Sequence, residues 1–193
     1  MADSFKLIPN LLTFLRLFLI PVLVALLAYD QNRLALIVFI VAAVTDFLDG
    51  LIARKFQAIS NFGKLMDPIA DKVLVMAALV MLVSMRGDFD ARPWAPGWMV
   101  VLVLARETWV TGLRAVASAN GIIVPADMWG KVKSFVQLVA VAFLIFHGPL
   151  LLGGMRIPTQ LVGEVLLLAS IFASYWGAWG YTHTILGKGA INN

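Results

Sequence analysis

Long apolar runs separated by short polar breaks organise this chain. Six runs approach or exceed the roughly 20 apolar residues that a helix needs to cross a bilayer: residues 8–29, 34–54, 63–84, 97–119, 130–150 and 160–182. The runs are continuous rather than alternating between polar and apolar residues, which favours helices over the strands of a barrel. The breaks carry polar, Gly and Pro residues typical of loops, at residues 30–33, 86–97, 120–127 and 148–158. We therefore expect an all-α integral membrane protein with six transmembrane helices.

The composition supports one membrane-embedded domain that spans residues 1–193. Hydrophobic residues make up 61% of the chain, and its mean hydropathy is +0.91, whereas an ordinary soluble domain is about half apolar. The first run is long enough to span a membrane, so we expect it to be a helix of the protein rather than a cleaved signal. The chain has no cysteine, which excludes disulfides and thiolate metal sites. No basic stripe follows any segment, so nucleic acid is not an expected partner.

The basic residues predict how the six spans are oriented. Six spans place both termini on one side, and short loops rich in Lys and Arg mark the cytoplasmic face. The side that holds the termini would carry more of these residues, namely Lys6, Arg54, Lys55, Lys64, Arg114, Lys131, Lys133 and Lys188. The opposite side would carry Arg33, Arg86, Arg92 and Arg156. We therefore expect a multi-pass protein with both termini in the cytoplasm.

Four aspartates interrupt the apolar pattern near the predicted cytoplasmic side. Asp46 and Asp49 lie near the end of the second run, and Asp67 and Asp71 near the start of the third. Spacings of three and four residues place each pair on one helix face, and the short loop between the runs brings the two pairs together. Four carboxylates in a poorly hydrated volume repel one another unless they are protonated or neutralised. Oxygen ligands suit Mg²⁺, Mn²⁺ or Ca²⁺, and a pair of such ions would suit phosphoryl displacement.

Two other interpretations of the aspartates remain open. The first is a set of internal salt bridges with Arg54, Lys64, Lys72 or Arg106. The second is a proton or cation pathway, as in a carboxylate-based ion transporter. A transporter would usually show inverted repeats or helices broken at mid-membrane, and neither is evident in the sequence. Gly50 and Ala53, beside the second aspartate, leave room either for a bulky substrate or for close helix packing.

The spacing of these residues resembles the signature of the CDP-alcohol phosphotransferase family. The motif reads Asp46-x-x-Asp49-Gly50-x-x-Ala53-Arg54, eight residues, then Gly63-x-x-x-Asp67-x-x-x-Asp71, with every defined position filled. The resemblance implies a six-helix membrane core, usually dimeric, that transfers a phosphatidyl or similar group from a CDP-activated donor to an alcohol and releases CMP. It also implies that the four aspartates bind two ions, Mg²⁺ or Mn²⁺, and that Asp71 is the general base. The CDP site would be lined by Asp49, Gly50, Ala53, Arg54, Gly63 and Asp67.

Further segments resemble the branch of this family that uses glycerol 3-phosphate as its acceptor. They are NLLTFLRLFLIP, LMDPIADKVLV, RETWVTGLR and GKVKSFVQ. This resemblance implies CDP-diacylglycerol and glycerol 3-phosphate as substrates, and an enzyme of the bacterial inner membrane with its active site on the cytoplasmic side. Membrane lipid and a second copy of the chain, in a homodimer, are the expected partners. The signature itself leaves the acceptor open, so inositol phosphate, phosphatidylglycerol and serine remain alternatives.

Two further polar groups lie in or beside the predicted spans. An acceptor phosphate needs cations that do not serve the metal ions, and the candidates are Arg106, Arg114, Lys131 and Lys133. Glu107 is expected to orient one of them; the alternative is that they set the topology and bind anionic lipid. Asn10, Thr13 and Arg16 recur every three residues on the first span. We interpret them as a polar wall beside the nucleotide, with ordinary hydrogen bonding between helices as the alternative.

Overall fold

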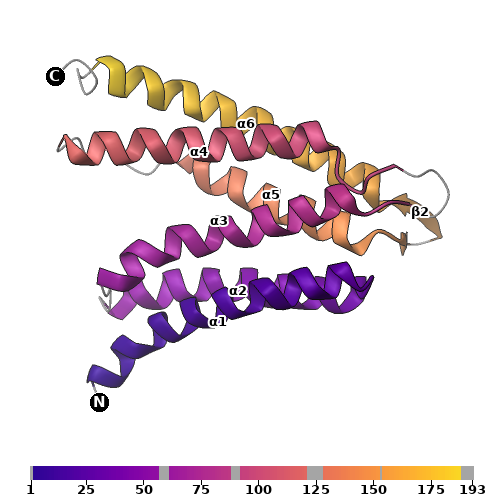
Figure 1. Ribbon diagram of the computed structural model, residues 1–193, viewed down its shortest axis with the longest axis horizontal. Helices are drawn as coiled ribbons and strands as arrows, with labels where there is room; N and C mark the ends of the chain where they lie inside the picture. The colour runs from indigo at the N-terminus through magenta and orange to yellow at the C-terminus, as the bar shows by residue number, and fades with distance from the viewer. Residues whose placement is uncertain (1, 57–60, 88–91, 121–127, 153, 188–193) are drawn as a thin grey trace.

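The computed structural model describes residues 2–56, 61–87, 92–120, 128–152 and 154–187, with side chains for part of them. Six helices dominate these residues: α1 (Ala2–Ala28), α2 (Asn32–Phe56), α3 (Asn61–Ser84), α4 (Gly97–Ala119), α5 (Met128–Phe146) and α6 (Thr159–Gly187). The strands β1 (Pro149–Leu152) and β2 (Met155–Pro158) form a small antiparallel hairpin. The helices run lengthwise, with both ends of the chain at one end of the bundle and the hairpin at the other (Figure 1).

Each predicted apolar run corresponds to one of these helices, so the mostly helical class is confirmed. The helices range from 19 residues in α5 to 29 in α6, which corresponds to about 28–43 Å at 1.5 Å per residue. Within the described residues, only Thr159–Gly180 of α6 combines the length and the hydropathy of a membrane span. In α4, Arg106, Glu107 and Arg114 interrupt the apolar stretch, and the described side chains cover only part of the remaining helices. The number of spans therefore stays a prediction.

The segment between α5 and α6 differs from the sequence-based expectation. The fifth run was expected to continue to residue 150 and a loose loop to follow, but α5 ends at Phe146 and a hairpin follows. Pro149 pairs with Pro158 and Leu152 with Met155, and Gly154 occupies the turn with φ 87°, a conformation that glycine adopts without strain. A two-glycine sequence between two short apolar runs is a known hairpin signal. That signal was present in the sequence but was read as part of a loop.

The turn between α1 and α2 has a regular helix-ending motif. The backbone N–H of Asp30 donates to the carbonyl of Leu27 at 3.1 Å, and that of Gln31 donates to the carbonyl of Leu26 at 2.8 Å. Asp30 has φ 57°, the left-handed conformation that ends many helices. These bonds satisfy carbonyls at the end of α1 and reverse the chain within a few residues. α2 therefore runs back along α1 and packs against it.

Buried apolar side chains and a close approach of two helices at a glycine hold the bundle together. α1 packs against α2 and α3 through buried aliphatic and aromatic side chains, among them Leu23, Phe39 and Leu79. α5 and α6 approach closely at Gly163, where an added Cβ would lie 2.7 Å from Leu144 Cγ. α4 packs against α6 and contacts α3. The segment of α4 around residue 107 lies beside α3 and α6, where charged side chains can meet.

Candidate active site

The backbone carries the four aspartates on helices, as the motif requires. α2 continues past residues 46 and 49 to Phe56, and α3 begins at Asn61, before residues 67 and 71. α2 and α3 are in contact. The predicted side chains that lie outside the described part are those of Asn10, Thr13, Asp49, Gly50, Ala53, Arg54, Gly63, Asp67 and Asp71. Among the side chains that the structure does describe, no three acids or histidines gather to form a metal site, so the four-aspartate site stays a prediction.

Asp46, the first aspartate of the motif, forms an ion pair with Arg16 of α1. Arg16 Nη1 lies 2.6 Å from Asp46 Oδ1; the arginine side chain is fully buried, and the aspartate is 34% exposed. Burying a guanidinium is costly unless an anion compensates it, so this pair holds the middle of α2 against α1. The sequence predicts that Arg16 lies beside the nucleotide. Arg16 was not among the basic residues considered as salt-bridge partners of the aspartates. The structure shows Arg16 paired with the carboxylate of the motif, and its place beside the nucleotide stays a prediction.

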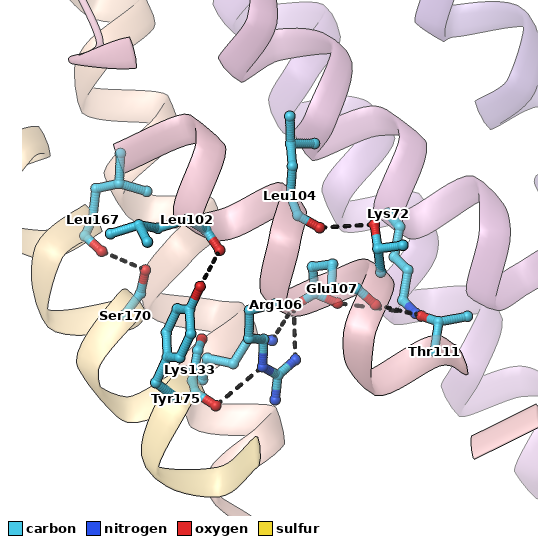
Figure 2. Close-up of polar contacts among 12 residues, drawn as sticks. Lys72, Leu102, Leu104, Arg106, Glu107, Thr111, Lys133, Leu167, Ser170 and Tyr175 are labelled. Carbon is cyan, nitrogen blue, oxygen red and sulfur yellow. Dashed lines mark hydrogen bonds and ion pairs between the residues drawn. The ribbon is translucent and has the colours of Figure 1, made fainter. Parts of the chain in front are cut away.

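A second charged cluster forms around Glu107 in α4. Glu107 Oε1 accepts hydrogen bonds from Lys133 Nζ and from Arg106 Nη1, the latter at 2.8 Å. Its other oxygen lies 3.9 Å from Lys72 Nζ. Figure 2 shows these side chains converging from α3, α4 and α5. One carboxylate therefore joins three cations from three helices.

Neighbouring polar groups fix the cations of this cluster. Lys72 Nζ donates to the hydroxyl of Thr111, one turn beyond Glu107 on α4, and that hydroxyl donates to the Glu107 carbonyl at 2.6 Å. Arg106 Nε donates to the carbonyl of Ser174 on α6 at 3.0 Å. The helices are thus joined by directional bonds, and the guanidinium cannot turn without breaking them.

The side chains of the cluster differ in their exposure to solvent. The side chains of Lys133, Arg106 and Glu107 are 6%, 10% and 12% exposed, and that of Lys72 is 27% exposed. Ion pairs with so little exposure are weakly screened by water. Loss of the carboxylate would leave cations in a poorly solvated volume, which is strongly unfavourable. The cluster is therefore organised around Glu107 and opens to solvent on the side of Lys72.

The structure brings two of the four predicted acceptor residues together and places Lys72 beside them. Arg106 and Lys133 meet at Glu107, which confirms that Glu107 orients basic side chains. Arg114 is exposed and lies seven residues beyond Glu107 on α4, on the same helix face. The side chain of Lys131 lies outside the described part. Lys72 was considered only as a salt-bridge partner of the aspartates, because its place beside α4 depends on helix packing that no local motif encodes.

Comparison with known proteins assigns the family. The model of the family described as CDP-alcohol phosphatidyltransferase matches residues 6–176. A CDP-diacylglycerol--glycerol-3-phosphate 3-phosphatidyltransferase of Bacillus subtilis is 37% identical over 193 residues, covering 90% of this chain and 92% of that protein. Proteins of the same name from Rickettsia typhi and Cereibacter sphaeroides are 37% and 40% identical, covering 91% and 71% of this chain and 95% and 62% of their own lengths. The chain therefore belongs to the CDP-alcohol phosphatidyltransferase family.

Proposed function

We propose that this protein transfers a phosphatidyl group from CDP-diacylglycerol to glycerol 3-phosphate, giving phosphatidylglycerophosphate and CMP. Relatives that align with about nine tenths of the chain bear the name of this activity. The observation in the structure that carries the proposal is the convergence of Lys72, Arg106 and Lys133 on Glu107. Such a cluster supplies cations for an acceptor phosphate. One of them, Lys72, directly follows Asp71, the last residue of the aspartate motif on α3.

The six helices would cross the membrane, with both termini and the active site on the cytoplasmic side. Large apolar side chains are exposed on α6, where Phe172, Trp176 and Trp179 are 72%, 84% and 77% exposed. Soluble monomers rarely expose such contiguous apolar surface, whereas lipid would cover it. The two ends of the chain lie at the same end of the bundle, as an even number of spans requires (Figure 1). A lipid donor and a water-soluble acceptor would meet at that membrane face.

The aspartates of α2 and α3 would form the reaction centre. The residues fit a pair of Mg²⁺ or Mn²⁺ ions, because the donor set is entirely carboxylate oxygen and Asp46, the one described, is ion-paired and partly exposed. The ions would be held by Asp46, Asp49, Asp67 and Asp71. When bound, they supply positive charge for the donor pyrophosphate and the departing CMP. Arg16 would keep the Asp46 carboxylate oriented.

The remaining residues of the motif would bind and deprotonate the substrates. Gly50, Ala53 and Gly63 would leave room for the cytidine nucleotide, and Arg54 would line its site, with Asn10 and Thr13 beside it. Asp71 would accept the proton of the acceptor hydroxyl, whose oxygen then attacks the phosphorus that carries diacylglycerol. The bond between this phosphorus and the bridging oxygen breaks, and CMP leaves with that oxygen.

The acceptor would be held through its phosphate by basic side chains of α4 and α5. Arg106 and Lys133 are in place at Glu107, and Arg114 and Lys131 would extend the site toward the cytoplasm. A guanidinium matches two phosphate oxygens at once, whereas an ammonium acts as a point charge. Replacing Arg106 or Arg114 by Gln should therefore raise the acceptor KM by roughly 10- to 150-fold, the range for losing a charged hydrogen bond. The donor KM should move much less, and an unchanged acceptor KM in both variants would refute this part.

The decisive experiment measures CMP release by the purified protein in lipid nanodiscs. CDP-diacylglycerol and Mg²⁺ are supplied with glycerol 3-phosphate, glycerol, inositol phosphate or serine, and products are identified by mass spectrometry. We expect phosphatidylglycerophosphate with the first acceptor and little release with the others. Equal use of another alcohol would refute the assignment of glycerol 3-phosphate as the acceptor. Absence of CMP release with every acceptor would refute the transferase reaction.

A further inference from the structure

We propose that Lys72 is a third cation of the acceptor-phosphate site and that Glu107 is the positioning residue that holds the three cations of this site together. The inference rests on the proposed function and adds to it two residues with defined roles. Neither belongs to the aspartate motif, and neither was among the predicted phosphate ligands. Together with Arg106 and Lys133 they form what we call the phosphate cradle.

The geometry of the cradle shows why one carboxylate is needed. Lys133 and Arg106 share one oxygen of Glu107, and Lys72 faces the other at 3.9 Å. Three cations at this distance from one centre repel one another, and their repulsion is strong because most of them are shielded from water. A central anion offsets this repulsion and fixes the direction of each side chain. The phosphate site would otherwise have to be assembled at the moment of binding.

The formal charge of the cradle matches a phosphate monoester. Three cations and one carboxylate leave an excess of two positive charges. A phosphate monoester carries close to two negative charges at neutral pH, since its second pKa is about 6. Glycerol 3-phosphate would neutralise the cradle, whereas an uncharged alcohol or the single carboxylate of serine would leave it charged. The cradle therefore selects for a phosphorylated acceptor.

The cradle also has donors to offer to a ligand. A carboxylate has two acceptor oxygens, whereas an ammonium has three N–H donors and a guanidinium has five. Glu107 therefore does not exhaust the donors of Arg106 and Lys133, even with the bond from Arg106 to the Ser174 carbonyl. The positions of these donors are already fixed, which lowers the entropic cost of binding.

Access and proximity place the acceptor correctly for the reaction. Lys72 and Thr111 form the exposed side of the cradle, so a water-soluble ligand would enter there. Lys72 directly follows Asp71, the proposed base, on α3. Consecutive Cα atoms are about 3.8 Å apart, so one turn of helix would carry both a phosphate ligand and the base. Lys72 would thereby couple acceptor binding to deprotonation of its hydroxyl.

The test compares four variants in nanodiscs with the parent protein. Lys72→Gln removes the charge and Lys72→Arg restores it, while Glu107→Gln keeps the shape of the positioning residue without its charge. Glu164→Gln is the matched control, because Glu164 lies on α6 and accepts a hydrogen bond from Gln160 away from the cradle. For each protein we would measure kcat, the KM of each substrate, and the inhibition constant of inorganic phosphate against glycerol 3-phosphate.

A phosphate cradle predicts a specific pattern. Lys72→Gln should raise the acceptor KM and the phosphate inhibition constant roughly tenfold, the lower end of the range for a charged hydrogen bond because Lys72 is partly exposed. Lys72→Arg should stay within about threefold of the parent, because the guanidinium restores the charge and the donors. The donor KM should be unchanged in all variants, and Glu164→Gln should match the parent. Unchanged acceptor KM and phosphate inhibition in Lys72→Gln would overturn the role of Lys72.

The sign of the Glu107→Gln effect decides the role of Glu107. If the carboxylate merely repelled the ligand, its removal would lower the acceptor KM. As a positioning residue, its removal should raise the acceptor KM and the phosphate inhibition constant about tenfold. Should this variant fail to fold, Glu107→Asp provides a second test, because it keeps the charge but shortens the side chain by one methylene; a positioning role then predicts a rise of about threefold. A lower or unchanged acceptor KM would overturn the positioning role.

The parent protein separates failure of this inference from failure of the proposed function. A parent that makes no phosphatidylglycerophosphate would refute the proposed function. Calorimetric titration with inorganic phosphate would then show whether the cradle binds phosphate. Phosphate binding that is weakened in Lys72→Gln and in Glu107→Gln, but not in Glu164→Gln, would support the cradle on its own. Equal phosphate binding in all these proteins would overturn it.

Discussion

The contact between α5 and α6 at Gly163 allows one substitution to be worked through in advance. In Gly163→Ala, the new Cβ would lie 2.7 and 2.8 Å from Leu144 Cγ and Cδ2, and 3.1 Å from the carbonyl oxygen of Ala140. Real Cβ atoms do not approach Cγ that closely, so α6 must shift or Leu144 must leave its rotamer. Overpacking of this kind costs about 1–3 kcal/mol. Replacing a helical glycine by alanine contributes about 1 kcal/mol in the opposite direction, so we expect a net loss of up to about 2 kcal/mol.

Gly177→Ala on the same helix is the matched control. No atom lies within 4 Å of a Cβ added at Gly177, so only the gain in helix propensity should remain. Thermal unfolding in one detergent would compare both variants with the parent. For a protein of this size, 1 kcal/mol shifts Tm by about 2–4 °C, so Gly163→Ala should unfold up to about 8 °C lower and Gly177→Ala slightly higher. A Tm for Gly163→Ala equal to or above that of Gly177→Ala would refute the close approach of α5 and α6.

The other predictions concern the reaction centre. Asp71→Asn should stop turnover while largely keeping donor affinity, because an amide cannot accept the acceptor's proton; a single-turnover rate within a few-fold of the parent would exclude Asp71 as the base. Chelation with EDTA should abolish activity and added Mg²⁺ should restore it, whereas full turnover in protein verified to be metal-free would contradict the metal site. Arg16→Met should destabilise the protein by about 2 kcal/mol, less than for a fully buried pair because Asp46 is one third exposed. A double-mutant cycle with Asp46→Asn, followed by thermal unfolding, should show that these two losses are coupled; simple additivity would argue against the ion pair.

Most helix positions could be predicted because they depend on local chemistry. A continuous apolar run fixes where a helix can lie in a membrane, and a break with Gly, Pro or polar residues fixes where it ends. The third run was predicted at residues 63–84 and the helix is Asn61–Ser84, while the fourth agrees at both ends. The hairpin after α5 was missed because two strands of four residues carry little periodic signal beside long apolar runs.

The reaction chemistry was also inferred from the sequence, because the aspartate motif lies on two helices joined by a short loop. Spacings of three and four residues place each pair of acids on one helix face, whatever the rest of the fold does. The family assignment agrees with the motif. The four aspartates were therefore identified from the sequence, whereas the role of Asp71 as the base is implied by the family resemblance. That role and the mutual geometry of the aspartates stay predictions.

The partners of the charged side chains were decided by tertiary structure alone. Arg16 and Asp46 are 30 residues apart in the numbering but form an ion pair across α1 and α2. Lys72, Glu107 and Lys133 come from three helices, and nothing near any of them in the sequence specifies the other two. A buried charge takes the nearest opposite charge that helix packing brings to it, and packing depends on contacts along whole helices such as those at Gly163. The sequence thus determined which chemical groups the protein has, and the packing of the helices determined which of them act together.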